Sequence, residues 1–251
     1  MDDSTKPILV STASQQAGNA YGPAPFSYEG AMEYLLAVIQ KLSLARDLDT
    51  IMSIVRHAAR RLTGAHGATF VLRDDDLCYY ADEDAISPLW KGQCFPMSSC
   101  ISGWVMLNRR HAVIDDIYAD PRIPAQAYRP TFVKSLVMVP IRTEAPIGAI
   151  GNYWAVPHRA SAEQVKLLQA LADSTSVAME NVQLYSTLQA RSEELARANA
   201  ALHSSLHARD EFLSIASHEL RTPIAALKLQ LHLLDRRSPP HSDRMPPKDE
   251  L

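Results

Sequence analysis

The sequence predicts an α+β protein in which helices flank an antiparallel sheet and one long helix follows. Three observations support this fold class. Short β-rich segments separated by turn residues lie between Ala68 and Val156. Apolar residues at helical spacing precede them. No Gly or Pro occurs between Pro157 and Pro223, so a helix there meets no breaker.

Composition narrows the class of protein. The chain has 251 residues, enough for one large or two small domains, and its net charge of −3 gives no basic surface for nucleic acid. Cys78, Cys94 and Cys100 form no CxxC pair, which favours a reducing compartment over secretion. No apolar run approaches the roughly 20 residues needed to cross a bilayer. The acidic segment Met1–Ser4 lacks a signal-peptide pattern. We expect a cytoplasmic protein that binds neither nucleic acid nor membrane.

The N-terminal part predicts a disordered leader and two helices. Residues 1–27 are rich in Ser, Gln, Gly and Pro and have no periodicity. Apolar residues at helical spacing predict a first helix from Tyr28 to about Ala45. A second helix should begin after Asp47 and end at Gly64, because Asp and Gly favour these two positions.

The middle of the chain predicts a sheet of about six strands. Ala68–Leu72 and Leu77–Ala81 flank the acidic turn Asp74–Asp76 and predict a hairpin; the turn lacks the spacing of a calcium loop, and we expect no metal site. The other expected elements are helical turns at Gly103–Asn108, a strand at Ala112–Ile114, a long loop at Asp115–Thr131, and two central strands at Ser135–Arg142 and Pro146–Val156.

A capping pattern opens the long helix. Ser161 and Gln164 have the spacing of a capping box, in which each side chain satisfies a free backbone N–H of the other residue. A helix that continues unbroken from this point would link the mixed domain mechanically to the C-terminal segment.

Heptads in this helix predict a coiled coil. Two series of positions, three residues apart, each recur every seven residues: Tyr185, Ser192, Asn199, Leu206, Leu213 and Leu220, and then Leu188, Leu195, Leu202, Arg209 and Ala216. This is an a/d pattern, and Asn199 at an a position favours two strands in register. We expect a parallel homodimer. In this frame His218 falls at f, the outermost position.

The segment around His218 carries the strongest chemical signal. It reads Ser217-His218-Glu219-Leu220-Arg221-Thr222-Pro223. A neutral imidazole is a nucleophile, and a neighbouring carboxylate can hold its tautomer. The run resembles the phosphoacceptor box of sensor histidine kinases, in which the histidine takes phosphate from ATP and passes it to an aspartate of a response regulator.

This resemblance implies roles for four residues. His218 would be the phosphoacceptor and Glu219 its acid/base partner. Thr222 would orient water for dephosphorylation of the regulator, and Pro223 would bend the helix. The alternative, a surface histidine without a role, is disfavoured because seven consecutive residues match and the heptad frame exposes the ring.

Three segments of the mixed domain together resemble a GAF domain over about Asp47 to Tyr185. They are Asp115–Arg122, Ser135–Ile141 and Ile147–Gly151. The resemblance implies a small-molecule site between the sheet and the long loop. Known GAF ligands include cyclic nucleotides, haem and bilins, and the resemblance does not choose among them. The signature of cyclic-nucleotide GAF domains is missing from this chain.

Covalent bilin binding is not expected. Bilin-binding relatives carry a cysteine where this chain has Gln126–Thr131, which contains none. The segment Gly92–Phe95 keeps Cys-Phe of a second bilin motif but lacks its aspartate. We expect a non-covalent ligand or none, with no chromophore on Cys94 or Cys100. We also expect Cys100 to be a small buried apolar residue and not a redox sensor.

Four aromatic residues allow two interpretations. Trp104, Tyr128, Tyr153 and Trp154 could line a ligand pocket or form ordinary core. Aromatic residues in strands usually belong to the core, so we prefer the second interpretation.

The sequence thus predicts five segments: a leader at 1–27, a GAF sensory domain at 28–185, a coiled coil at 186–210, part of a HisKA phosphoacceptor domain at 211–235 and a disordered tail at 236–251. No P-loop or Gly-rich phosphate cradle occurs, so ATP would act only through a catalytic domain supplied in trans.

The preferred function is the sensory and phosphoacceptor part of a cytoplasmic sensor kinase. The alternative is an inactive dimeric GAF module that regulates full-length kinases.

Overall fold

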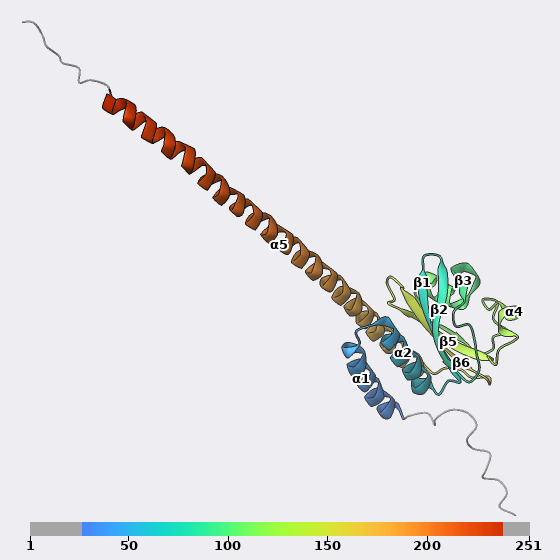
Figure 1. The fold of residues 1–251 in the computed structure, drawn as a ribbon. Coiled ribbons are helices and arrows are strands. Elements are labelled where there is room, and N and C mark those ends of the chain that lie inside the picture. The colour runs from blue at the N-terminus through green and yellow to red at the C-terminus, as the bar shows by residue number, and fades with distance from the viewer. Residues whose placement is uncertain (1–26, 238–251) are drawn as a thin grey trace, which may run out of the picture. The chain divides into compact units, whose positions relative to one another are not determined.

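The computed structural model describes residues 27–237 (Figure 1). Its helices and strands are α1 (Tyr28–Leu44), α2 (Leu48–Thr63), β1 (Gly67–Asp74), β2 (Leu77–Ala85), β3 (Cys94–Pro96), the 3-10 turn η1 (Met97–Ser99), α3 (Ile101–Asn108), β4 (Ala112–Ile114), α4 (Ala125–Tyr128), β5 (Ser135–Ile141), β6 (Gly148–Trp154) and α5 (Ala162–Arg237). The expected leader up to residue 26 and the expected tail from residue 238 lie outside the described residues. The chain forms two units divided between Ser186 and Thr187, and each is described by itself.

The first unit contains a six-stranded antiparallel sheet in the order β3-β2-β1-β6-β5-β4. The predicted hairpin is confirmed as β1 and β2, both longer than expected, with Asp75 at φ 49° in the turn. The two strands predicted as central are confirmed as β5 and β6. Of these, β6 pairs with β1 at the centre of the sheet, whereas β5 lies one strand from the edge.

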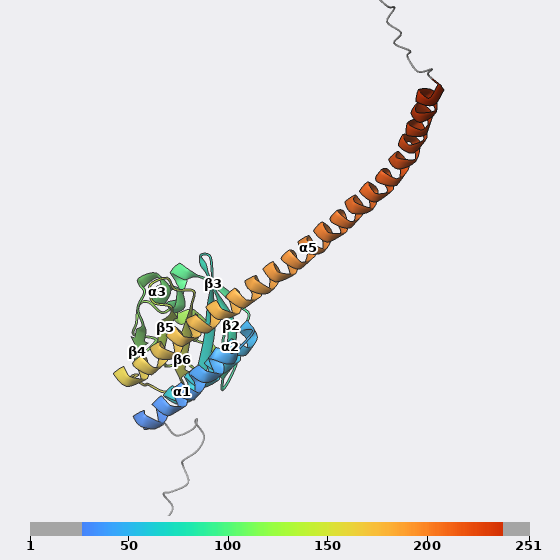
Figure 2. The same ribbon diagram turned by 90° about the vertical axis from the view of Figure 1, so that its left-hand side faces the viewer.

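Helices cover one face of the sheet, and α3 with the loop segments covers the other (Figures 1 and 2). Figure 2 shows α1, α2 and the beginning of α5 side by side, where their apolar faces join a first buried cluster with the sheet. A second buried cluster lies between the sheet and the segment that contains α3 and α4. Strands β1, β5 and β6 send alternate side chains into both clusters, as expected for a sheet covered on two faces.

The predicted helix ends are confirmed in their hydrogen bonds. The carboxylate of Asp47 accepts from the Thr50 N–H at 2.7 Å, and Gly64 ends α2 in the left-handed region at φ 67°. At the start of α5, the Ser161 N–H donates to Gln164 Oε1 at 2.9 Å. The Gln164 N–H donates back to Ser161 Oγ at 3.2 Å, which completes the capping box.

Three short elements were not predicted, and one of them is the 3-10 turn η1 (Met97–Ser99). Strand β3 is three residues long and is defined by its backbone pairing with β2, not by an alternating pattern of its own. Helix α4 forms one turn inside the segment that we expected to be an irregular loop. All three are too short to produce a periodic signal in the sequence.

The second unit is the C-terminal part of α5. Helix α5 ends at Arg237, two residues beyond the expected end of the phosphoacceptor segment, and it continues through Pro223. Between Tyr28 and Arg237, no helix is long and apolar enough to cross a lipid bilayer.

Candidate functional site

His218 lies on α5 with a fully accessible ring. Its side chain is 78% exposed, as is that of Glu219. The Nδ1 atom of His218 lies 3.9 Å from Oε1 of Glu219, an ion-pair distance that is longer than a hydrogen bond. The carboxylate thus lies on the Nδ1 side of the ring.

The turn after His218 contains the other two predicted residues. The Thr222 hydroxyl lies 3.5 Å from the carbonyl oxygen of His218, at the limit of a hydrogen bond. Residues four apart share one face of a helix, so Thr222 and His218 project from the same side. Pro223 has no N–H and leaves the carbonyl of Glu219 without its helical donor. The structure thus brings His218, Glu219 and Thr222 within one helical turn.

The heptad positions of the second unit are exposed in the single chain. Leu195 and Leu202 are 70% and 58% exposed, and Leu220 is 61% exposed. These values resemble the exposure of His218 at f. The single chain therefore does not distinguish the a/d side of the helix from its outer side, and only a partner helix would do so.

In the region where the sequence predicted a small-molecule site, aromatic residues of the chain pack against one another. The ring of Trp90 packs edge-on against Tyr128 at 4.8 Å and against Tyr80 and Tyr153 at 5.6 Å between centroids. Tyr128, Tyr153 and Trp154 are buried, which confirms the prediction that they form core. Sequence reasoning missed Trp90, because it lies on an irregular segment whose contacts come from distant elements.

Buried tyrosine hydroxyls in this region have polar partners. The Tyr153 hydroxyl lies 2.9 Å from Thr69 Oγ1, and that of Tyr80 lies 3.1 Å from Ser102 Oγ. Burial raises the pKa of all three tyrosines, Tyr80, Tyr128 and Tyr153. They are therefore neutral hydrogen-bonding groups and do not act as acids or bases near neutral pH.

Trp104 is the exception among the four predicted aromatic residues. It is half-buried and lines a surface pocket of about 450 Å³, together with Arg110, His111, Ala112, Val113 and Arg122. The guanidinium groups of Arg110 and Arg122 lie 4.9 and 4.5 Å from the centroid of its ring. Arg122 also makes two hydrogen bonds to the Asp120 carboxylate, which hold the pKa of Asp120 below its usual range.

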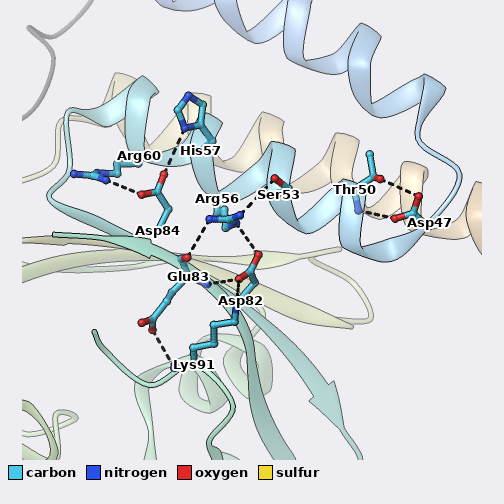
Figure 3. Close-up of polar contacts among 10 residues, drawn as sticks. All are labelled: Asp47, Thr50, Ser53, Arg56, His57, Arg60, Asp82, Glu83, Asp84 and Lys91. Atoms are coloured by element: carbon cyan, nitrogen blue, oxygen red, sulfur yellow. Dashed lines mark hydrogen bonds and ion pairs between the residues drawn. The ribbon is translucent and has the colours of Figure 1, made fainter. Parts of the chain in front are cut away.

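The acidic run Asp82–Asp84 on β2 holds neighbouring segments of the fold together. Figure 3 shows Arg56 and Arg60 of α2 directed toward Asp82 and Asp84 of β2, with both ion pairs at 2.6 Å. The residue between these two aspartates in the sequence is Glu83. Its carboxylate accepts hydrogen bonds from three backbone N–H groups at 2.9–3.0 Å, those of Leu89, Trp90 and Lys91. The run joins α2 to the sheet and holds the segment that carries Trp90. The sequence offered a signal, three consecutive acidic residues in a strand, that our sequence reasoning did not use.

Comparison with known proteins identifies both units. The model of the GAF domain family matches residues 45–180, and that of the His Kinase A (phospho-acceptor) domain matches residues 208–249. No curated protein gives a significant match.

Solved structures support the fold of the first unit. A free methionine-R-sulfoxide reductase from Neisseria meningitidis is 16% identical, with a TM-score of 0.57 over 66% of this chain and 97% of the other. The GAF domain of an Acinetobacter phosphoenolpyruvate-protein phosphotransferase is 13% identical, with a TM-score of 0.55 over 62% and 97%. The chromophore-binding domain of a bacteriophytochrome from R. palustris is 18% identical, with a TM-score of 0.53 over 62% of each chain. At these identities the likeness concerns the fold alone. The chain belongs to the GAF domain family and carries a HisKA segment after that domain, the combination found in a sensor histidine kinase.

Proposed function

We propose that this chain is the sensory and phosphoacceptor part of a cytoplasmic two-component sensor histidine kinase, in which His218 receives phosphate and passes it to a response regulator. The observation that carries the proposal is the position of His218. It lies in the seven-residue run that resembles a phosphoacceptor box, within the segment that the HisKA model matches, with an exposed ring.

The geometry favours Nε2 of His218 as the nucleophile. The Glu219 carboxylate lies on the Nδ1 side, where it can hold a proton and keep the lone pair on Nε2. Attack of Nε2 on the γ-phosphorus of ATP forms the N–P bond and breaks the bond to the β–γ bridging oxygen, so ADP leaves. The Nδ1–H then carries the positive charge of the imidazolium, which the carboxylate stabilises.

The position of Thr222 suits a role in dephosphorylation of the response regulator. Its hydroxyl makes only a long hydrogen bond to the His218 carbonyl and can turn to solvent. From the same helical face it could orient a water molecule toward the phospho-aspartate of a docked receiver domain. This role follows from the family resemblance and from the shared face.

The proposed partners are a second copy of this chain, a catalytic ATP-binding domain and a receiver domain. The exposed apolar a and d positions of α5 suit a parallel homodimer. ATP is a substrate that the catalytic domain would hold. We assign no signal to the GAF domain, because nothing in its second buried cluster identifies the chemistry of a ligand.

Phosphorylation in trans tests the proposal. The full chain is mixed with a separately expressed catalytic domain of a related kinase and γ-labelled ATP. We expect label on the chain that is lost in acid and kept in alkali, as for a phosphoramidate, and no label without the catalytic domain. His218→Gln should abolish labelling, whereas His207→Gln, an exposed histidine of the same helix, should not. Label that persists in His218→Gln would exclude His218 as the acceptor.

A further inference from the structure

Two of the three cysteines converge in the second buried cluster, although they are 22 residues apart. Cys78 on β2 is fully buried, and Cys100 immediately before α3 is 9% exposed. Cys78 and Tyr80 lie on the same face of β2, because strand residues two apart share a face. That face packs against the turn before α3, which is held to the hairpin by a hydrogen bond from the Met97 N–H to the Asp76 carbonyl at 2.9 Å.

This turn is tightly folded around the Cys100 sulfur. Gly103 lies so close to the backbone of Met97 that a Cβ atom there would clash with it. The Cys100 side chain caps the first turn of α3, because its Sγ accepts a hydrogen bond from the Gly103 N–H at 3.4 Å. The expectation that Cys100 is buried is confirmed, but its thiol is hydrogen-bonded and does not behave as a plain apolar group.

Several polar groups surround the same sulfur, and in the thiol form its S–H donates to the Pro96 carbonyl oxygen at 3.5 Å. The Ser102 hydroxyl lies 3.2 Å from Cys100 Sγ and 3.1 Å from the Tyr80 hydroxyl, so Tyr80 can donate to Ser102 and Ser102 to the sulfur. The Cys78 thiol belongs to the same buried cluster and lies near enough to the Cys100 thiol for the two side chains to interact. Donors that converge on a sulfur stabilise its thiolate. The hydrogen bond from Cys78 is the main cause that lowers the pKa of Cys100, and the same bond, followed by burial, raises the pKa of Cys78.

The third cysteine is on the other face of the sheet. In the pairing of β2 with β3, Cys78 lies opposite Phe95, whereas Cys94 lies opposite Tyr79. Residues directly opposite in antiparallel strands share a face, so Cys94 faces away from Cys78. The structure thus selects one pair among the three cysteines.

We propose that Cys78 and Cys100 form an oxidisable thiol pair, in which a peroxide oxidises the Cys100 sulfur and Cys78 then closes a disulfide between β2 and the start of α3. The Cys100 thiolate attacks one peroxide oxygen, the O–O bond breaks, and the sulfur gives up two electrons. This yields a sulfenic acid and hydroxide, and the hydroxide takes up a proton from solvent to become water. The Cys78 sulfur then attacks the sulfenic sulfur. An S–S bond forms, the S–O bond breaks, and a second water leaves with the Cys78 proton.

The disulfide would change the cap of α3. Its sulfur atoms carry no negative charge, so the Gly103 N–H loses an anionic acceptor, and the first turn of α3 becomes covalently tied to β2. Trp104, which lines the surface pocket, lies on this helix. The modification is a property of the first unit and does not depend on the phosphoacceptor role of His218.

The test is peroxide oxidation of the native full chain. The chain is treated with hydrogen peroxide, quenched, unfolded, alkylated with N-ethylmaleimide and analysed by mass spectrometry. Of the three cysteines, only Cys94 should be alkylated, and a peptide pair joined through Cys78 and Cys100 should appear. Dithiothreitol treatment before alkylation should restore all three sites.

Three variants separate this pair from general oxidation. Cys94→Ser, the matched control, should still form the disulfide. In Cys100→Ser, Cys78 should remain fully alkylatable. In Cys78→Ser, which keeps a hydrogen-bond donor near the sulfur, the sulfenic acid on Cys100 should persist and react with dimedone. Complete alkylation of the wild type after peroxide, or a disulfide that contains Cys94, would overturn the proposal. The wild-type and Cys94→Ser results decide the matter even if the other two variants do not fold.

Discussion

The side-chain amide of Gln164 donates a hydrogen bond to the carbonyl oxygen of Thr63 at 3.0 Å, which connects the first turn of α5 to the last turn of α2. The last carbonyls of a helix have no donor within that helix, so Gln164 satisfies a group of α2 while it also caps α5 through Ser161. One side chain therefore joins two helices that are neighbours only in the folded structure.

Gln164→Ala should destabilise the first unit. The variant loses the capping box and leaves the Thr63 carbonyl without this donor, and we expect the free energy of unfolding to fall by about 1–2 kcal/mol. Urea unfolding followed by tryptophan fluorescence measures this, because all three tryptophans lie in the first unit. Gln189→Ala is the control, since that exposed amide contacts only Glu193 at 3.5 Å in the described hydrogen bonds. Equal stability of the two variants would contradict the proposed link.

The stability of the first unit should decrease as the pH falls below the ordinary histidine pKa of 6.5, partly because of His66. Burial is the main cause that lowers the pKa of His66, with further contributions from the charges of Arg60 and His158. Its Nδ1 accepts the Ala155 N–H at 3.1 Å, which requires that nitrogen to be unprotonated. Below pH 6.5 the unfolded chain binds the proton more readily than the folded chain, so protonation favours unfolding.

The measurement is the free energy of unfolding at pH 7.5 and at pH 5.5. In His66→Gln the difference between the two pH values should be smaller than in the wild type. His203→Gln, on the exposed part of α5, should leave the difference unchanged. An identical difference in His66→Gln and the wild type would exclude His66 as a contributor.

Leu195→Ala and Leu202→Ala should each weaken the homodimer. Both side chains occupy d positions and are exposed in the single chain, so a partner helix would bury them. Each truncation should cost roughly 2–5 kcal/mol of dimerisation free energy if burial is complete. Sedimentation equilibrium measures the dissociation constant. Arg197→Ala, at an f position, is the control and should change it little; a monomeric wild type at micromolar concentration would refute the coiled coil.

Glu219→Ala should slow phosphorylation in trans without abolishing it. If the carboxylate acts on Nδ1 as proposed, its loss should reduce the rate by about 10²–10⁴-fold. The initial rate of labelling at saturating ATP measures this. Glu211→Ala, at another f position, should retain the wild-type rate. A wild-type rate in Glu219→Ala would exclude an acid/base role of this carboxylate in phosphorylation.

Local signals in the sequence determined much of the secondary structure and the candidate site. The helix ends at Asp47, at Gly64 and at the Ser161–Gln164 box depend on backbone groups within a few residues. They can therefore be predicted from the local sequence without knowledge of the rest of the fold. Helical and alternating periodicity located α1, α2 and the long strands for the same reason. His218, Glu219 and Thr222 belong to one helical turn, and their proximity follows from spacing alone.

Contacts between distant segments were decided only by the tertiary structure. Trp90 meets Tyr128 and Tyr153 because the order of the strands brings three separate parts of the chain to one face of the sheet. Cys78 meets Cys100 because the pairing register of β2 fixes which face of the sheet Cys78 occupies. A shift of one residue would move Cys78 to the opposite face. Sequence spacing carries no information about such register. In the single chain the heptad leucines are exposed, and the burial that the heptad pattern predicts would require a second helix.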